Sequence, residues 1–228
     1  RVGRLLALEV DERLIAELRP RLASMAHVEV RHADARRFDY STLPALRPSP
    51  AGRVVVVGNL PYSASKPILD RLVEARTAIS EMVLTLQEEV AERVAALPGS
   101  KRYGALSVLT QLYCEVRVVM TIAPGAFRPP PKVDSAVLHL RVLQAPCVPV
   151  GDERGFQRVV KAAFSQRRKS LANALAAGLR LPVDTARARL AEAGIDPTRR
   201  AETLSLHEFA RLAASFAAQK AFAGSQGL

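Results

Sequence analysis

Four consecutive residues are best suited to chemistry: Asn59, Leu60, Pro61 and Tyr62. An exocyclic amine of a nucleobase is a poor nucleophile because its lone pair is delocalised into the ring. Two acceptors placed on the hydrogens of the amine localise that pair and stabilise the positive charge that develops in the transition state. The side-chain oxygen of Asn59 and the backbone carbonyl of Leu60 can supply these two acceptors.

The rest of this turn supports the same interpretation. Pro61 has a fixed φ and forces Leu60 into an extended conformation, which holds the Leu60 carbonyl in one orientation. Tyr62 offers a ring face for a base removed from its stack. An ordinary turn is the alternative, because Asn and Pro both favour turns. The apolar run 54–57 favours a site, since it predicts a buried parallel strand, and α/β sheets place their active sites at the carboxyl ends of such strands.

Two carboxylates lie at the ends of two other predicted strands. Glu9 is in the strand predicted at 5–10, where a nucleotide-binding sheet holds a carboxylate for ribose hydroxyls. Asp34, followed by Ala35, comes after the strand predicted at 27–31 and can accept a hydrogen bond from the amino group of a cofactor adenine. Acids at strand ends are also common as solvated residues or helix caps. Together with the turn, however, these two outline a crevice for adenosine.

Strands and helices alternate along the first part of the chain. The hydrophobic periodicity predicts strands at 5–10, 27–31, 53–57 and 81–86 and helices at 11–23, 67–75, 88–96 and 105–112. This alternation is typical of the α/β class with a doubly wound, mostly parallel sheet. Strands predicted at 115–122 and 135–142 have only a proline-rich loop between them, so we expect an antiparallel edge.

The second part of the chain is predicted to be helical. A run around 144–151, rich in proline and glycine, interrupts the periodicity and indicates a linker. Helices are predicted at 156–164, 169–179 and 183–193 and after a capping box of Ser205 and Glu208. We therefore expect a small all-α domain over 151–220.

The charge predicts a polyanionic partner. Lysine and arginine total 33 against 22 acidic residues, which gives a net charge of +11 and a pI near 10.4. An arginine-rich composition can also reflect genome bias, but residues 151–228 hold 13 basic and only 7 acidic side chains. Lys132 and the run Arg167, Arg168 and Lys169 are therefore candidate contacts for nucleic-acid phosphates, with a solvated helix face as the alternative.

The composition argues against several other classes. Cys114 and Cys147 are the only cysteines, and neither has a second Cys or a His at a metal-ligand spacing, so we expect no disulfide framework and no metal site. No apolar run approaches the ~20 residues that span a bilayer, and the first residues do not form a signal peptide. We expect a cytoplasmic protein without membrane contact.

Several motifs taken together resemble the ribosomal RNA adenine dimethyltransferase family, and most closely its small-subunit branch. The resemblance runs from about residue 5 to residue 216. It rests on the motifs at 8–11, 34–35, 58–62 (Gly-Asn-Leu-Pro-Tyr), 86–90, 103–108, 127–137 (beginning Phe-Arg-Pro-Pro-Pro-Lys), 163–169 and 194–197. The glycine-rich cofactor turn of the family is absent, because the chain opens at what corresponds to the second strand. We interpret the sequence as an N-terminally truncated version of the enzyme.

The resemblance implies a transfer of two methyl groups from S-adenosylmethionine to the amino nitrogen of each of two adjacent adenines in a small-subunit rRNA hairpin, as a step of ribosome biogenesis. It implies that Glu9 holds the cofactor ribose and that Asp34 and Ala35 hold the cofactor adenine. Asn59 would border both cofactor and substrate. The implied partner is the pre-ribosomal small subunit, and we expect a monomer.

The same resemblance implies the roles on the substrate side. Asn59 and Leu60 would accept hydrogen bonds from the target amine, and Pro61 would hold the Leu60 carbonyl in its orientation. Tyr62 and Phe127 would sandwich the flipped base, a role that aromatic faces fill well. A core position is the alternative for Phe127, but a ring in a triple-proline loop is more readily presented than buried.

The resemblance also assigns 1–145 to a methyltransferase catalytic domain and 151–220 to a helical rRNA-binding domain. Large-subunit rRNA adenine dimethylases and DNA adenine methyltransferases use the same chemistry, and the motifs at 127–137 and 166–169 favour the small-subunit enzyme over both. A non-catalytic RNA-binding or ribosome-assembly factor with the same fold is a further alternative. The missing glycine-rich turn supports it, and the retained candidate site opposes it.

Overall fold

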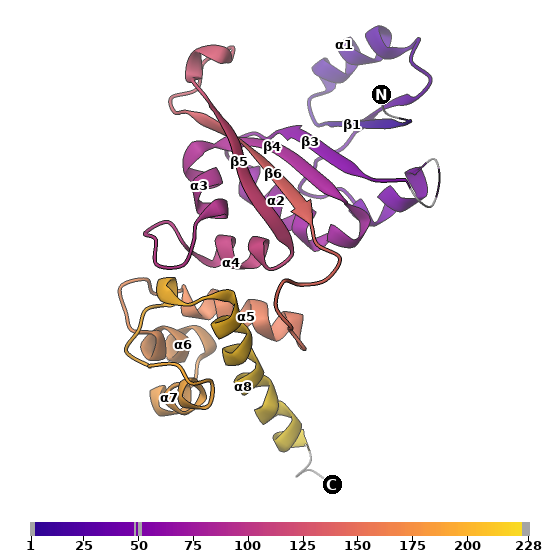
Figure 1. The fold of residues 1–228 in the computed structure, drawn as a ribbon. Helices are drawn as coiled ribbons and strands as arrows, with labels where there is room; N and C mark the ends of the chain where they lie inside the picture. Colours follow the sequence, from indigo (N-terminus) through magenta and orange to yellow (C-terminus); the bar gives the residue numbers. More distant parts are fainter. Residues whose placement is uncertain (1–2, 48, 50–51, 225–228) are drawn as a thin grey trace. The chain divides into compact units, whose positions relative to one another are not determined.

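The computed structural model describes residues 3–47, 49 and 52–224 (Figure 1). The strands are β1 (Leu5–Glu9), β2 (Val28–His32), β3 (Val55–Asn59), β4 (Glu81–Gln87), β5 (Cys114–Ile122) and β6 (Ser135–Val142). The helices are α1 (Glu12–Leu22), α2 (Ser65–Glu74), α3 (Glu88–Ala95), α4 (Ala105–Gln111), α5 (Glu153–Ala163), α6 (Leu171–Leu179), α7 (Val183–Glu192) and α8 (Leu206–Gly224). Every predicted strand and helix is confirmed, with ends that shift by about three residues at most.

Two βαβ units supply the parallel strands. β1 and β2, connected by α1, form a two-stranded parallel sheet. β3 and β4, connected by α2, pair in parallel within a four-stranded sheet of order β3-β4-β6-β5. β6 runs antiparallel to β4. The two parallel pairs, each connected by a helix, confirm the predicted α/β class with a mostly parallel sheet. The insertion of β6 between β4 and β5 was not predicted, because periodicity identifies strands but not their order.

The core of the four-stranded sheet forms between β4, β6 and α2. Leu84 and Leu138 lie directly opposite each other in the β4–β6 ladder and are fully buried. Leu69 and Leu72 of α2 are buried as well. Full burial of a leucine side chain contributes about 1.5–3 kcal/mol. These side chains therefore fix β4, the strand against which β3 is aligned.

β3 differs from the buried strand that its valines predicted. Val55 and Val57 are 49% and 76% exposed, and Asn59 on the same face is exposed too. The reason is that β3 is the last strand of its sheet and pairs only with β4 among the described residues. A run of β-branched residues predicts an extended strand, but it does not distinguish a strand with two neighbours from one with a single neighbour.

The chain divides into two compact units. One contains residues 1–88 and 119–142, which include β1 to β4 and β6. The other contains residues 89–118 and 143–228, which include α4 to α8. α4 thus groups with the C-terminal helices, whereas the domain boundary predicted from sequence separates it from them. No helix in the described part of the chain is long and apolar enough to cross a membrane.

Aromatic rings connect the helices of the second unit. The ring of Phe164 lies 6.0 Å from that of Tyr103 in an edge arrangement and 5.7 Å from that of Phe209. Pairs at such distances contribute about 0.5–1.5 kcal/mol beyond the area that they bury. Tyr103 precedes α4, Phe164 follows α5 and Phe209 is in α8, so this row of rings holds three elements together.

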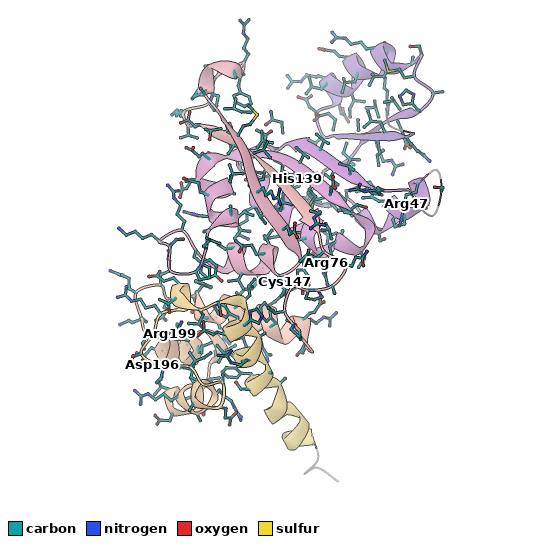
Figure 2. All side chains as sticks on the ribbon, in the orientation of Figure 1. Arg47, Arg76, His139, Cys147, Asp196 and Arg199 are labelled. Carbon is teal, nitrogen blue, oxygen red and sulfur yellow. The ribbon has the colours of Figure 1, made fainter. Side chains whose placement is uncertain are left out.

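The capping box at the start of α8 is confirmed. Ser205 donates from its N–H and its hydroxyl to Glu208 Oε2 at 2.8 and 3.0 Å, and the Glu208 N–H donates back to Ser205 Oγ at 3.3 Å. Arg199 donates to Glu208 Oε1 at 2.5 Å (Figure 2). In the segment that leads from α7 to α8, the Asp196 carboxylate accepts from the Thr198 N–H. The Arg199 guanidinium first, and then Ser205, lower the pKa of Glu208 to about 2.

We expect Glu208→Gln to lower the free energy of unfolding by about 1 kcal/mol at pH 7, because glutamine can keep the capping geometry but loses the charge that faces Arg199. The pKa of Glu208 in the folded chain is about 2, below its ordinary 4.5. The carboxylate therefore stabilises the fold fully above about pH 4.5, and this contribution is lost as the pH falls through about 2.

Chemical denaturation of both proteins between pH 7 and pH 2 measures this effect, and the two free energies should converge toward the acid end. Glu17→Gln is the control, because its partner Arg21 lies 3.9 Å away and both side chains are exposed. A difference that stays constant down to pH 2 would contradict the role of the Glu208 charge.

Candidate active site

The turn after β3 begins where the β3–β4 ladder ends. Asn59 pairs with Thr85 as the last residue of β3, and the Leu60 N–H donates to the Thr85 carbonyl at 3.1 Å. This bond extends the ladder by one residue and fixes the peptide of Leu60. The Leu60 side chain is buried, and a Cβ at Gly58 would lie 3.0 Å from its Cδ2, so glycine leaves the space that Leu60 fills. Leucine therefore anchors the turn, while the Asn59 amide is exposed.

Tyr62 is fixed at its backbone and at its hydroxyl. Its carbonyl accepts from the Ser65 hydroxyl at 3.0 Å, and its own hydroxyl lies 2.6 Å from Ser135 Oγ. Ser135 is fully buried at the start of β6. The Ala64 N–H donates to the Pro61 carbonyl at 2.9 Å and closes the turn. The ring of Tyr62 is thus held in place, and among the described residues it pairs with no other aromatic ring.

Residues 123–134, here called the Phe127 loop, are fixed at both ends by Glu88. The Thr121 hydroxyl donates to the Glu88 carboxylate at 3.4 Å before the loop. At the other end, the Glu88 N–H donates to the carbonyl of Asp134, the last residue of the loop, at 3.0 Å. Within it, Phe127 has an extended backbone after the 3-10 turn η3 (Pro124–Ala126), and its side chain is half-buried.

Glu9 ends β1, and one of its carboxylate oxygens is occupied by the backbone. Oε1 accepts from the N–H groups of Val10 and Asp11 at 2.7 and 2.9 Å. Asp11 in turn caps α1 by accepting from the Arg13 N–H at 2.9 Å. A carboxylate has acceptor positions on both oxygens. The second oxygen of Glu9 can therefore accept from a diol while the first holds the turn.

Asp34 lies at the same edge of the β1–β2 sheet as Glu9, because it comes two residues after the end of β2. Arg36 donates to both of its carboxylate oxygens at 2.6–3.0 Å, and these bonds lower the pKa of Asp34 to about 2. The neighbouring Ala35 carbonyl accepts from the Tyr40 hydroxyl at 2.8 Å. Because the Arg36 side chain is 54% exposed, this ion pair contributes little, and a ligand can displace the guanidinium.

The candidate phosphate contacts are Lys132, Arg167, Arg168 and Lys169, all of them exposed. The last three lie in the turn between α5 and α6, two to four residues before the start of the helix to which the sequence assigned them. Arg167 donates to the Lys101 carbonyl and lies 3.7 Å from Glu202, so its guanidinium is partly engaged within the protein. The other three have no such partner among the described residues.

The sequence matches one family over nearly its whole length. Residues 1–218 match the sequence model of the ribosomal RNA adenine dimethylases. The chain belongs to this family. A relative from Geobacter metallireducens, "Ribosomal RNA small subunit methyltransferase A", is 47% identical over 213 residues, which are 93% of this chain and 77% of the relative. The protein of that name from Shouchella clausii is 41% identical over 217 residues, 93% of this chain and 72% of the relative.

Solved structures share the fold of this rRNA adenine dimethylase. A dimethyladenosine transferase from Plasmodium falciparum aligns with a TM-score of 0.76 at 22% identity, over 95% of this chain and 83% of that one. The 23S rRNA methyltransferase ErmE aligns with a TM-score of 0.65 at 25% identity, over 94% and 82%. These likenesses confirm the predicted Rossmann-like methyltransferase fold.

The structure gathers the predicted site residues of the dimethylase into two groups. Glu9, Asp34 and Ala35 share the carboxyl edge of the β1–β2 sheet. The turn at 59–62 and the Phe127 loop meet at the hydrogen bond between Tyr62 and the residue that follows the loop. The chemical roles of all these residues stay predictions.

Three residues that shape these groups were missed in the sequence. Ser135 and Glu88 lie inside motifs that were recognised, but a serine at a strand start and a glutamate at a helix start have ordinary structural explanations. Arg36 is two residues from Asp34, and its exposed position gives no signal of the ion pair. Only the folded chain shows which polar side chains meet.

We expect Tyr62→Phe to lower the free energy of unfolding by about 1 kcal/mol, because it leaves the buried Ser135 hydroxyl without its partner. Tyr103→Phe is the matched control. The Tyr103 hydroxyl is also buried but has no hydrogen-bond partner among the described residues, so its removal should change stability little. Denaturant unfolding compares both variants. Equal losses would contradict the hydrogen bond between the turn and β6.

Proposed function

We propose that this chain is an S-adenosylmethionine-dependent enzyme that dimethylates the N6 amino groups of adjacent adenines in a small-subunit rRNA hairpin during ribosome biogenesis. One observation carries the proposal: the β3–β4 ladder fixes the Leu60 peptide beside the exposed Asn59 amide. Membership in the rRNA adenine dimethylase family supports the reaction class. The names of the curated relatives support the small subunit as the source of the RNA.

The turn provides the acceptors that this reaction needs. The Asn59 side-chain oxygen and the Leu60 carbonyl accept hydrogen bonds from the target amine and favour a nitrogen with a localised lone pair. Acceptors that need little reorganisation during the reaction are the most effective, and the β3–β4 ladder fixes the Leu60 peptide that carries one of the two. S-adenosylmethionine supplies an electrophilic methyl group, and the amine loses one proton for each methyl that it gains.

Two rings are available to the flipped adenine. Tyr62 is oriented through its hydroxyl by Ser135, and Phe127 stands in a loop whose ends are fixed. Both side chains are only half-buried, and the base would stack on the ring surface that they leave exposed.

The residues at the β1–β2 edge fit an adenosine group of the cofactor. Glu9 has one oxygen bound to backbone N–H groups, which leaves the other for the ribose hydroxyls. Asp34 and Ala35 would hold the adenine, once Arg36 has turned away from the Asp34 carboxylate. Because Arg36 is exposed, breaking its ion pair with Asp34 costs little free energy.

The net charge of +11 supports an RNA partner. We assign 1–145 to catalysis and 151–220 to rRNA binding. The contacts to rRNA phosphates would come from Lys132, Arg167, Arg168 and Lys169. The protein would act as a monomer on the pre-ribosomal small subunit, in the cytoplasm.

We expect Asn59→Ala to reduce methyl transfer at least about 100-fold, by analogy with the loss of one polar group aimed at a transition-state charge. The assay incubates unmethylated small subunits with labelled S-adenosylmethionine and maps methylated adenines by mass spectrometry. Asn173→Ala, on an exposed site of α6, is the matched control and should keep full activity.

Retention of rRNA by Asn59→Ala should stay close to that of the unchanged protein. Equal loss of transfer and rRNA binding would contradict the role assigned to Asn59. Label that appears in large-subunit RNA would show that the large-subunit rRNA is the substrate instead. A lack of transfer even by a version that carries the family's glycine-rich cofactor segment would favour a non-catalytic assembly factor.

We expect Glu9→Gln to raise the Kd for S-adenosylmethionine about tenfold or more, because hydrogen bonds to a charged acceptor contribute about 1.5–3 kcal/mol. The amide oxygen can keep the two backbone bonds of Glu9, while an NH2 group replaces the oxygen that would face the ribose. Isothermal titration measures the Kd. Glu12→Gln, three residues further along and exposed, should bind like the unchanged protein. An unchanged Kd in Glu9→Gln would exclude the ribose contact.

A further inference from the structure

A basic stripe runs along α5, apart from the residues assigned above. Arg154, Gln157, Arg158 and Lys161 recur at three- and four-residue spacing, so they lie along one side of the helix. The buried apolar residues of α5 lie on its other side. These four residues are here called the α5 stripe.

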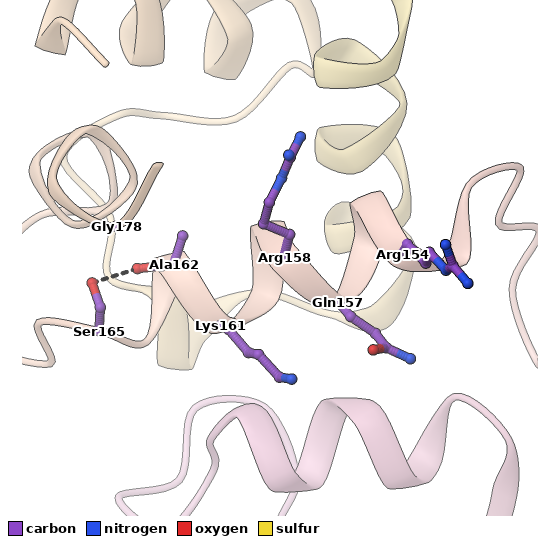
Figure 3. Close-up of a pocket in the computed structure, with 7 residues that line it drawn as sticks. All are labelled: Arg154, Gln157, Arg158, Lys161, Ala162, Ser165 and Gly178. Carbon is purple, nitrogen blue, oxygen red and sulfur yellow. Dashed lines mark hydrogen bonds between the residues drawn. The ribbon is translucent and has the colours of Figure 1, made fainter. Parts of the chain in front are cut away.

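The α5 stripe lines a pocket of about 410 Å³ (Figure 3). Figure 3 shows its side chains fanning out from α5, with Ser165 and Gly178 at one end. A Cβ on Gly178 would lie 2.6 Å from Ala162 Cα, so glycine allows α6 to approach α5 closely there. The Ser165 hydroxyl donates to the Ala162 carbonyl at 2.7 Å and secures the end of α5. The pocket therefore has one wall of close-packed backbone and one of long polar side chains.

The cations of the α5 stripe have no anionic partner in the part of the chain that the structure describes. Arg154, Arg158 and Lys161 are exposed, form no ion pair with a described residue, and share the pocket with no acidic lining residue. Several arginines on other helices are paired, as Arg187 is with Asp184 at 3.1 Å. Three like charges around one hollow repel one another, and a bound polyanion relieves that repulsion.

We propose that the α5 stripe binds the sugar-phosphate backbone of rRNA. From Arg154 to Lys161 the helix rises about 10 Å, which suits a chain of phosphates better than one small anion. Residues 154–169 contain six basic side chains and no acidic one, so the stripe continues into the turn that holds the predicted contacts 167–169. Gln157 adds a neutral donor and acceptor for ribose hydroxyls. This inference rests on the rRNA substrate proposed above. It adds the α5 stripe to the residues of the protein that contact that rRNA.

The test removes the three charges together in the full chain, as R154Q/R158Q/K161Q. Binding to small-subunit rRNA is measured by fluorescence anisotropy between about 50 and 300 mM KCl. Each lost phosphate contact lowers the slope of log K against log salt by about 0.7, so the slope should fall by about 2 and the affinity near 0.1 M about 100-fold. Circular dichroism verifies that the variant is folded.

The matched control is R21Q/R93Q/R187Q, which removes the same charge from exposed helical arginines that are paired with Glu17, Glu89 and Asp184. Its salt slope should stay within about 0.7 of that of the unchanged protein. A slope in the α5 variant equal to that of the unchanged protein would overturn the proposal, and so would an equal loss in the control. Weaker binding of inorganic phosphate without a change in the rRNA slope would overturn it as well.

A second readout separates this inference from the proposed enzyme function. In methyl transfer, the α5 variant should show a KM for small subunits raised at least about tenfold with an unchanged kcat, because the α5 stripe contacts no reacting atom. If even a version with the family's glycine-rich cofactor segment transfers no methyl group, but the α5 variant still has a lower salt slope, the enzyme function is contradicted and the α5 surface is supported. If transfer proceeds and the α5 variant behaves like the unchanged protein in both assays, the surface alone fails.

Discussion

The position of the candidate acceptors depends on backbone hydrogen bonds between β3 and β4. β4 is held by buried leucines, β3 is aligned on β4 residue by residue, and one further bond from Leu60 continues that alignment into the turn. The proline that follows then limits the rotation of the Leu60 peptide. Acceptors that must meet both hydrogens of one amine need this accuracy, and a ladder provides it without any charged group in the site.

Hydrogen bonds to buried or backbone groups hold the site together, whereas ion pairs act locally. Ser135 is fully buried and orients Tyr62, and two backbone N–H groups orient Glu9. The ion pairs of Asp11 and Asp34 are each made with an arginine two residues further along the chain. Such pairs shape a turn but contribute little to the fold, because both partners reach solvent. Loss of either pair is therefore expected to change the stability of the fold little.

Most elements of this fold were predictable because their apolar residues recur with a clear period. The helices and strands, the capping box of Ser205 and Glu208 and the parallel pairing all follow from local rules. The strand order and the exposure of Val55 and Val57 did not, since both depend on which strands become neighbours.

The candidate site shows the same limit. Asn59 and Tyr62 belong to one tetrapeptide, and a local rule identifies them. The contact between Tyr62 and Ser135 joins residues 73 positions apart, and no pattern in the sequence indicates that distance. The α5 stripe has regular spacing, but its lack of anionic partners becomes visible only when the surrounding residues are in place.

The double attachment of the Phe127 loop has an evolutionary consequence. Glu88 secures the segments on both sides of the loop, so the sheet is insulated from changes within it. Exposed residues between the attachments, such as Arg128 to Pro130, can therefore vary while β5 and β6 keep their places. Phe127 is the position in the loop where a replacement would reach the proposed base contact, whereas changes at its exposed neighbours would leave that contact in place.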